Sequence, residues 1–325
     1  MSNKLLEVKD LKTYFTITAG EVKAVDGVSF SLNRGESIGL VGESGCGKTT
    51  TALSVIKLLP DNGYIADGSI IFDGREITDL KDEDLRSFRW KEVSMIFQGA
   101  MNALNPVRRV SDQIAEAILL HENVTKAEAL ERVRELFELV ELDPNLMFSY
   151  PHEFSGGMRQ RAIIAMSLAC NPKLVIGDEP TTALDVMVQA QIIDLINDLR
   201  KKLGMSMIMI THDLSIIVET CDRICVMYAG KVVETGETEQ VVNKCLHPYT
   251  EKLIGAFPNI YKERKMVESI PGDPPDLYNP PPGCRFAARC HKSIGDICFN
   301  EDPPLVDYDG SGHMVACHLR RAGND

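Results

Sequence analysis

One glycine-rich stretch constrains the fold of this 325-residue chain more than any other feature. Residues 42–50 read GESGCGKTT, which is the spacing G-x-x-x-x-G-K-T. An apolar run, Ile38 to Val41, precedes the stretch, and a helical pattern of apolar residues follows it. Strand, glycine loop and helix in this order form a phosphate cradle, because backbone N–H groups and a helix N-terminus converge on the anion. The stretch therefore predicts a nucleoside triphosphate site at Gly42, Glu43, Ser44, Gly45, Cys46, Gly47, Lys48, Thr49 and Thr50.

Two side chains at the end of the stretch have the chemistry that such a site needs. Lys48 reaches the outer phosphates, and the Thr49 hydroxyl is a ligand for Mg²⁺. A chance glycine-rich turn is the alternative, and the strand before it and the helix after it argue against that alternative.

The composition excludes several classes of protein. A formal net charge of −12 argues against a mainly electrostatic grip on nucleic acid or on anionic lipid. No apolar run reaches the roughly 18 residues of a membrane span, and the start MSNKLLEVKD is not a signal peptide. Nine cysteines, an odd number, argue against a secreted disulfide framework. We expect a soluble, intracellular chain.

The N-terminal part precedes the phosphate loop. Residues 4–32 alternate apolar and polar positions in short runs that Gly20 and Gly27 break, which predicts a small antiparallel sheet. Tyr14 and Phe15 lie on this sheet. Either ring can stack on a nucleotide base or serve as a cross-strand partner, and the sequence leaves both interpretations open.

The middle of the chain changes character after residue 98. Asn105-Pro106 breaks the chain, and two amphipathic helical patterns follow, one around Ile114 and one around Val133. We expect a helical insertion in an α/β core. Beyond it, Ser155 and two glycines open another helix, where they either present N–H groups to a phosphate or form an ordinary N-cap.

Polar side chains follow three predicted strands at the points where these strands end. In a parallel sheet, functional groups collect at the carboxyl ends of the strands. The residues placed there are Gln98, Asp178, Glu179 and His212.

These motifs, in this order, resemble the ATP-binding cassette (ABC) ATPases of membrane transporters over roughly residues 4–257. The resemblance implies that ATP is bound with Mg²⁺. Phe15 then stacks on adenine, with Tyr14 as the fallback, while Lys48, Thr49 and Thr50 hold the phosphates and the metal ion.

The resemblance also implies the catalytic residues. Gln98 senses the metal ion and the attacking water, and Asp178 binds Mg²⁺ through water. Glu179 is the catalytic base or orients the water, and His212 contacts the γ-phosphate. The chemistry asked of these groups is mainly positioning and charge neutralisation.

The remaining motif residues imply a dimer. In the family, the ATP held by one subunit is contacted by the signature of the opposite subunit, which here is Ser155, Gly156 and Gly157, and Asp185 lies near the seam. One chain carries one phosphate loop and one signature, so two complete sites need two chains facing head to tail. Departures from the usual pattern include Phe154, Met158, Gly99-Ala100 and Cys46.

Three segments narrow the resemblance to one branch. YPHEFSGGM from 150, PTTALD from 180 and HPYT from 247 are similar to the ATPase subunits of dipeptide and oligopeptide importers, with nickel importers as close relatives. The branch implies a peripheral subunit on the cytoplasmic face of the membrane that powers import by ATP-driven dimerisation. Its partners are a second ATPase, related or identical, two integral membrane permeases and an extracytoplasmic substrate-binding protein, without nucleic acid.

The tail carries four cysteines behind a proline-rich connector, spaced C-x5-C-x7-C-x18-C at Cys284, Cys290, Cys298 and Cys317. In an intracellular chain this density indicates a metal site rather than disulfides. The absence of close C-x-x-C pairs weakens zinc, and four thiolates suit a 4Fe-4S cluster, with which similar tails of peptide-importer ATPases are associated. Zinc and unliganded structural thiols stay open, with His291, His313 and His318 as alternative ligands.

Two other functions remain as alternatives. A soluble ABC ATPase acting on nucleic acid or ribosomes usually carries coiled-coil arms or two cassettes, and this acidic chain shows neither. In a redox protein, ATP would merely regulate the tail cluster.

We therefore expect an α/β fold: a P-loop NTPase (RecA-like) core with an antiparallel β subdomain, an inserted α-helical subdomain and a small C-terminal cysteine-containing extension. The expected domains are residues 1–257, with the helical part at about 99–160, and residues 258–325.

Overall fold

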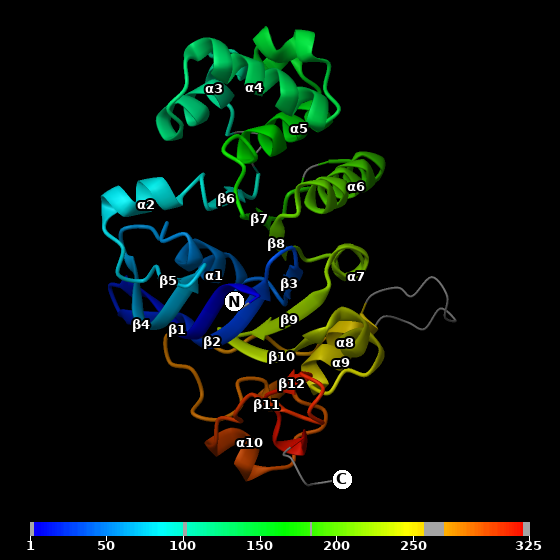
Figure 1. Ribbon diagram of the computed structural model, residues 1–325. Helices are drawn as coiled ribbons and strands as arrows, with labels where there is room; N and C mark the ends of the chain where they lie inside the picture. Colours follow the sequence, from blue (N-terminus) through cyan, green and yellow to red (C-terminus); the bar gives the residue numbers. More distant parts are fainter. Residues whose placement is uncertain (1–2, 100–102, 183, 257–269, 321–325) are drawn as a thin grey trace. The chain divides into compact units, whose positions relative to one another are not determined.

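The computed structural model describes residues 3–99, 103–182, 184–256 and 270–320 (Figure 1). The chain divides into two compact units by its internal contacts. One unit, here called the helical unit, comprises Asn33–Glu36 and Asp79–Met209. The other, here called the loop unit because it carries the phosphate loop, comprises Ser2–Leu32, Ser37–Thr78 and Ile210–Asp325.

An antiparallel sheet forms the first part of the loop unit. Its strands follow the order β2 (Gly20–Asn33), β1 (Lys4–Ile17), β4 (Gly63–Phe72) and β5 (Arg75–Glu76). The antiparallel sheet expected from the alternating pattern is confirmed. Gly27 differs from the expectation, since it lies inside β2 at φ +83° and does not end the strand.

Buried strands form the second part of the loop unit. β3 (Ser37–Val41) is buried at all five positions and pairs in parallel with β9 (Arg223–Tyr228), from Ile38 opposite Arg223 to Val41 opposite Val226. β10 (Lys231–Glu237) continues from β9 as an antiparallel neighbour. A fully buried strand needs a continuous apolar run, which is why β3 shows no alternation in the sequence. The helices of this unit are α1 (Lys48–Val55), α7 (Leu214–Thr220), α8 (Thr238–Asn243) and α9 (Pro248–Gly255).

The cysteine extension continues this sheet. Its β12 (Met314–Val315) pairs with β10, with Val315 opposite Glu234, and β11 (Val306–Asp307) follows at the edge. Figure 1 shows the extension in orange and red below β10. Its remaining elements are the short helices η4 (Ala287–Arg289), α10 (Asp296–Asn300) and η5 (His318–Arg320).

An aromatic cluster joins the extension to the rest of the loop unit. Phe286 is 1 % exposed, and its ring centroid lies 5.2 Å from that of Tyr228 and 5.4 Å from that of Tyr249, both edge to face. Such pairs add specific geometry to a large buried apolar area. The extension therefore shares the core of the loop unit.

In its described residues, the helical unit contains the strands β6 (Val93–Ile96), β7 (Leu174–Asp178) and β8 (Ser206–Ile210), the helices next to them in the chain, and the inserted helices. The strands follow the order β8, β7 and β6, and β6 and β7 are parallel. β7 and β8 are buried throughout, and they are two of the predicted strands after which the polar side chains follow. α2 (Asp82–Phe88) and α6 (Val186–Leu203) accompany these strands.

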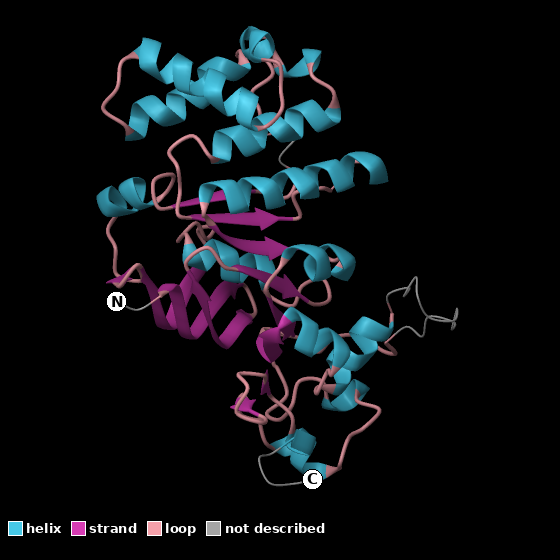
Figure 2. Cartoon of the chain, turned by 45° about the vertical axis from the view of Figure 1, so that its right-hand side comes forward, coloured by secondary structure: helices cyan, strands magenta, loops and turns pink. Residues whose placement is uncertain are grey.

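The inserted helices are confirmed and packed together (Figure 2). They are α3 (Val110–His121), α4 (Lys126–Leu139), η2 (Pro144–Phe148), η3 (Pro151–Glu153) and α5 (Gly156–Ser167). Thr125 and Glu128 form a capping box at the start of α4. Phe154 is 4 % exposed, and its ring meets that of Phe137 edge to face at 6.4 Å. The phenylalanine that departs from the usual signature therefore fills the core of the insertion.

We predict that Phe286→Ala lowers the free energy of unfolding of the loop unit by roughly 3–5 kcal/mol, because it removes the central ring of the aromatic cluster. Phe299→Ala is the matched control, since Phe299 belongs to the same extension and is 47 % exposed, and it should change stability by less than about 0.5 kcal/mol. Urea unfolding followed by circular dichroism measures both. Equal losses would mean that the cluster does not hold the extension.

Candidate functional site

The phosphate loop runs from the end of β3 into α1 and leaves no room for side chains at two glycines. A Cβ at Gly42, where φ is +151°, would lie 2.1 Å from the carbonyl oxygen of Met227 in β9. A Cβ at Gly47, where φ is +104°, would lie 2.4 Å from the carbonyl oxygen of Ala24 in β2. Both backbone angles strongly favour glycine. The backbones of β9 and β2 thus hold the loop in place at Gly42 and Gly47.

Lys48 is the first residue of α1, and its side chain turns back over the loop. Its ammonium group donates hydrogen bonds to the carbonyl oxygens of Gly42 at 2.8 Å and Glu43 at 3.0 Å. Thr51 stabilises the start of the helix, because its hydroxyl donates to the Gly47 carbonyl at 2.9 Å. The helix N-terminus and the lysine therefore converge on the loop, as a phosphate site requires.

Cys46 lies inside the loop as a small buried group. Its side chain is 3 % exposed, and burial raises the pKa of the thiol, although the Lys48 ammonium opposes this shift. A protonated thiol is a poor nucleophile. The residue therefore fills space next to Gly42, whose Cβ would lie 2.7 Å from the Cys46 sulfur.

Phe15 and Tyr14 point to opposite faces of β1, since side chains alternate along a strand. Thr13, on the same face as Phe15, lies 2.8 Å from the hydroxyl of Ser54 in α1. Tyr14 donates a hydrogen bond to Asp26 at 2.9 Å and packs edge to face on Tyr64. Phe15 is therefore on the α1 face and remains the preferred candidate for stacking on the base, while Tyr14 has a structural contact of its own.

His212 belongs to the loop unit and follows the end of β8. Its side chain is exposed. The next residue, Asp213, is the N-cap of α7 and accepts a hydrogen bond from the backbone N–H of Ser215 at 2.9 Å. The cap fixes the turn that presents His212.

Gln98 and Glu179 meet within the helical unit. The Gln98 amide nitrogen donates to the Glu179 carboxylate at 2.8 Å, and the Thr182 hydroxyl donates to the same oxygen at 3.0 Å. The backbone of Glu179 has φ +49°, a left-handed conformation that residues other than glycine seldom adopt. Strained residues of this kind concentrate at functional sites. Asp178, directly before it, ends β7 and is 2 % exposed.

The signature residues open α5 beside the start of α6. Ser155 is the N-cap of α5 and accepts from the N–H of Met158 at 3.2 Å, so it has the ordinary capping role as well as its exposed position. A Cβ at Gly157 would lie 2.9 Å from Val188 of α6, so only a glycine lets these helix starts approach. Asp185 caps α6 through the N–H of Val188 at 3.0 Å.

The two units divide the predicted residues between them. The loop unit holds Phe15, Tyr14, residues 42–50 and His212, and the helical unit holds Gln98, Asp178, Glu179, Ser155, Gly156, Gly157 and Asp185. Sequence reasoning missed two contacts of the phosphate loop: the hydroxyl of Tyr249 accepts from the N–H of Glu43 at 2.9 Å, and Arg289 pairs with the Glu43 carboxylate. Arg289 lies between Cys284 and Cys290 in the tail, and this basic residue was the feature of the sequence that could have indicated the second contact.

The four tail cysteines are free thiols that lie within electrostatic range of one another. Burial raises the pKa of Cys284 to about 12, and the thiols of Cys317, Cys290 and Cys298 add to the shift. The N–H of Cys284 donates to the carbonyl of Cys298 at 2.8 Å. Across the described ranges, however, no three His, Cys, Asp or Glu side chains form a group able to hold a metal ion.

The three histidines considered as ligands make other contacts. His313 Nε2 lies 2.7 Å from the buried carboxylate of Glu234, and His318 Nε2 lies 2.8 Å from the carbonyl oxygen of Glu301. His291 lies 3.6 Å from the carboxylate of Glu251.

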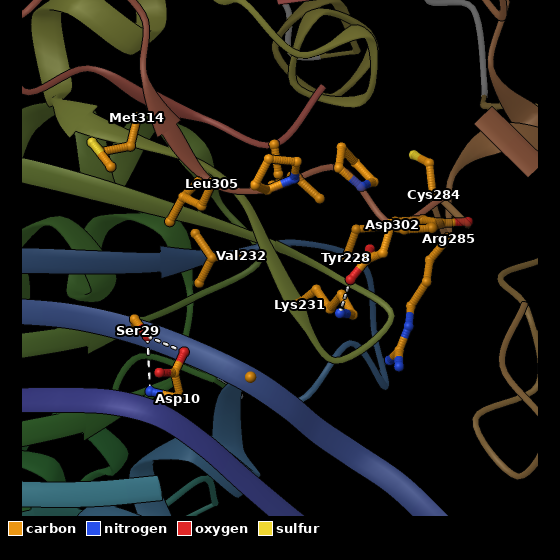
Figure 3. A pocket seen from close by; sticks show the side chains of 15 residues that line it. Asp10, Ser29, Tyr228, Lys231, Val232, Cys284, Arg285, Asp302, Leu305 and Met314 are labelled. Atoms are coloured by element: carbon orange, nitrogen blue, oxygen red, sulfur yellow. Dashed lines mark hydrogen bonds and ion pairs between the residues drawn. The ribbon is translucent and has the colours of Figure 1, made fainter. Parts of the chain in front are cut away.

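A cavity of about 450 Å³ borders Cys284, the first cysteine of the tail (Figure 3). Cys284 and Arg285 line it together with an ion pair between Lys231 of β10 and Asp302 of the extension. Its far wall is the Asp10–Ser29 hydrogen bond between β1 and β2. The polar groups of the cavity are therefore largely paired with one another.

Comparison with known proteins agrees with the motifs. The profile of the ABC transporter family matches residues 25–182, and that of the oligopeptide/dipeptide transporter C-terminal region matches residues 233–298. The oligopeptide transport ATP-binding protein OppD of Bacillus subtilis (strain 168) is 46% identical over 306 residues, which cover 93% of this chain and 85% of that protein. The chain belongs to the oligopeptide/dipeptide group of ABC transporter ATP-binding proteins.

Other members and solved structures agree with this assignment. The dipeptide transport ATP-binding protein DppD of Bacillus subtilis (strain 168) is 47% identical over 320 residues, with 98% of this chain and 95% of that protein covered. CbiO1 of Clostridium perfringens, part of the ABC transporter complex cbiONQ, has a TM-score of 0.65 at 27% identity, covering 75% of this chain and 92% of that chain. The dimeric ATP-binding cassette MJ0796, bound to ADP and Pi, has the same TM-score at 24% identity, covering 72% and 99%, and supports the cassette fold. This ABC family member is an ATPase.

On the assignment of Glu179 as the base, we predict that Glu179→Gln retains ATP binding and lowers the turnover rate by about 100-fold or more, because the amide keeps the shape and cannot accept the proton. Lys48→Ala should instead weaken ATP binding about 10-fold or more, because a charge-assisted contact to the phosphates is lost. Fluorescent-nucleotide titration and phosphate release measure the two effects.

Glu7→Gln is the control for both variants, since Glu7 pairs with Lys4 and Lys9 on β1 away from the motifs and should leave binding and turnover unchanged. Full ATPase activity of Glu179→Gln would exclude Glu179 as the base.

Proposed function

We propose that this ATPase powers the import of dipeptides or oligopeptides through a membrane permease. The observation that carries the proposal is that residues 233–298 match the C-terminal region of oligopeptide/dipeptide transporters. Within the loop unit, this segment contributes to the buried aromatic cluster described above. Relatives named as oligopeptide and dipeptide transport ATP-binding proteins support it.

In the proposed reaction, each unit supplies part of the machinery. The loop unit binds the nucleotide: Phe15 stacks on adenine, Lys48 and Thr50 hold phosphates, and His212 contacts the γ-phosphate. Mg²⁺, which Thr49 and Asp178 would hold with Gln98, neutralises charge on the phosphates. Glu179 orients the water, and its hydrogen bond to Gln98 fixes the carboxylate for that task.

ATP-driven dimerisation supplies the second half of each site. Ser155, Gly156 and Gly157 contact the ATP of the opposite subunit in this proposal, and Asp185 lies at the seam. The two residues after Asp185 support an interface there, because Val186 is 79% exposed and Met187 72% exposed. Exposed apolar side chains beside a polar motif are typical of a contact surface. The opposite subunit is a second copy or a related ATPase.

We assign the permease contact to the helical insertion. Val107, 79% exposed, and Leu120, 74% exposed, give it apolar surface. None of the helices in the described ranges is long and apolar enough to cross a membrane. The proposal therefore places the chain at the cytoplasmic face as a peripheral subunit, with two integral permeases and an extracytoplasmic substrate-binding protein as partners.

We further propose that residues 1–257 form the nucleotide-binding domain and that residues 258–325 form a C-terminal extension of it, in which Cys284, Cys290, Cys298 and Cys317 hold a 4Fe-4S cluster. The boundary itself lies outside the described residues. The argument is the chemistry of the donors: four free, partly buried thiols gather in one segment. A single zinc ion needs every sulfur about 2.3 Å away, whereas in a cluster each thiolate binds a different iron and the sulfurs lie further apart.

Peptide import is tested in cells that lack this chain. Wild-type protein should restore the uptake of radiolabelled di- and oligopeptides, Glu179→Gln should not, and the control Glu7→Gln should behave as wild type. Chain-dependent uptake of nickel without uptake of peptides would replace peptides by nickel as the substrate. Co-purification with ribosomes or nucleic acid, and not with permeases, would contradict transport.

The cluster is tested by anaerobic purification with iron, sulfide and zinc quantified beside a visible spectrum. We expect brown protein with about four irons per chain, lost in Cys290→Ser. Cys245→Ser is the matched control, since Cys245 is a partly buried thiol outside the extension and should keep the iron. Colourless protein with about one zinc would make the tail a structural zinc module.

A further inference from the structure

The phosphate loop contains a carboxylate, and this carboxylate is a problem for an anion site. Glu43 is the second residue of the loop, directly after Gly42. Its side chain is 25% exposed. A negative charge next to bound phosphates raises the free energy of the complex unless a cation neutralises it, and the effect grows where water is excluded.

Arg289 of the extension supplies that cation. Its guanidinium donates to both carboxylate oxygens of Glu43, from Nη1 at 2.7 Å and from Nη2 at 3.0 Å. Paired parallel hydrogen bonds of this kind are stronger and more directional than a single contact with lysine. The Arg289 side chain is 7% exposed, so the pair is shielded from solvent on the arginine side.

The guanidinium is itself held on every side. Nη1 also donates to the hydroxyl of Tyr228 at 3.0 Å, Nη2 to the carbonyl of Ile270 at 3.2 Å, and Nε to the carbonyl of Pro271 at 2.9 Å. All of its N–H groups therefore have acceptors. An arginine locked in this way fixes the position of its partner and does more than balance its charge.

Glu43 in turn restrains the loop through the hydrogen bonds of its backbone. Its backbone N–H donates to the hydroxyl of Tyr249, and its carbonyl oxygen accepts from Lys48 Nζ at 3.0 Å and from the N–H of Cys46 at 3.2 Å. Pro274, Pro275 and Leu277 of the connector border the same part of the loop around a cavity of about 30 Å³. The conformation of the loop and the site of the Lys48 ammonium thus depend on where Glu43 is held.

We propose that Arg289 is a positioning residue of the phosphate loop, which neutralises and fixes Glu43 so that the loop accepts the triphosphate. The proposal rests on ATP binding at this loop and is independent of the transported substrate. It assigns the cysteine extension a part in nucleotide affinity, through the residue that directly precedes Cys290.

The test is a set of variants of the full chain, with ATP affinity measured by fluorescent-nucleotide titration. Arg289→Ala should raise the Kd for ATP about 10-fold, because the half-buried Glu43 carboxylate of the loop then lacks its cation. Glu43→Gln alone should raise the Kd by less than Arg289→Ala does, since it removes the charge and keeps one oxygen as a hydrogen-bond acceptor for Arg289. The double variant Arg289→Ala/Glu43→Gln should bind ATP more tightly than Arg289→Ala, since the repelling charge is gone, and less tightly than Glu43→Gln, since residue 43 has lost the arginine that holds it.

Two further variants separate charge from geometry and from general damage. Arg289→Lys keeps a cation without the paired hydrogen bonds and should fall between wild type and Arg289→Ala. Lys231→Ala is the matched control: it breaks the Lys231–Asp302 pair, which also ties the extension to the sheet but does not touch the loop, and it should leave the Kd within about 2-fold. The turnover rate at saturating ATP should stay within about 3-fold in Arg289→Ala, because Glu179 is unchanged.

Several results would overturn the proposal. They are an unchanged Kd in Arg289→Ala, a double variant that binds as weakly as Arg289→Ala or more weakly, and a loss in Lys231→Ala as large as that in Arg289→Ala. Thermal unfolding shows whether Arg289→Ala is folded, and if it is not, Arg289→Lys with and without Glu43→Gln gives the same comparison. Failure of the wild type to bind ATP would instead refute nucleotide binding by the loop.

Discussion

The close approach of the phosphate loop to two strands is the constraint on which the loop unit depends. Carbonyl oxygens of Met227 and Ala24 occupy the space that side chains at Gly42 and Gly47 would need. Backbone hydrogen bonds extend the contact, since the N–H of Gly230 donates to the Cys46 carbonyl at 2.9 Å and the N–H of Asp26 donates to the Gly230 carbonyl at 2.8 Å. Backbone atoms of the neighbouring strands therefore preorganise this part of the loop.

A second layer of contacts surrounds this backbone frame. Tyr228 and Tyr249 are fully buried, with ring centroids 4.7 Å apart, and their hydroxyls reach Arg289 and the N–H of Glu43. Burial raises the pKa of both hydroxyls, so they stay neutral hydrogen-bonding groups. A buried Tyr hydroxyl needs such a partner. The aromatic core of the loop unit thus supports the phosphate loop.

The sequence allowed the local motifs to be predicted because their physics is local. The glycine spacing, the cap at Ser155 and the polar residues at strand ends all follow from a few neighbouring residues. The structure places Gln98 beside Glu179, as expected for residues that follow the carboxyl ends of strands. The pair of Arg289 with Glu43 spans 246 residues, and the position of the arginine between two cysteines does not indicate so distant a partner. The family resemblance favoured Phe15 over Tyr14 for stacking on the base, and the contact of Thr13 with α1 shows that Phe15 lies on the face of β1 toward that helix.

The buried pair of Glu234 and His313 could not be predicted for the same reason. Glu234 is 0 % exposed and accepts hydrogen bonds from the backbone N–H groups of Leu246 and His247, at 2.7 Å and 2.9 Å, as well as contacting His313. From the sequence alone, a glutamate in a strand is expected to face solvent. Here the extension covers Glu234. The tail histidine then has a partner inside the fold and is occupied by it.

The pairing of β12 with β10 also changes what the sheet presents at its border. An open strand displays a row of unpaired backbone groups on which another chain can form a strand, and proteins shorten or cover such edges to stay unaggregated. Here the seven-residue β10 is covered, and the border passes to the two-residue strand β11. So short a strand offers almost nothing to a foreign β-strand, and the extension thereby protects the protein from edge-to-edge association.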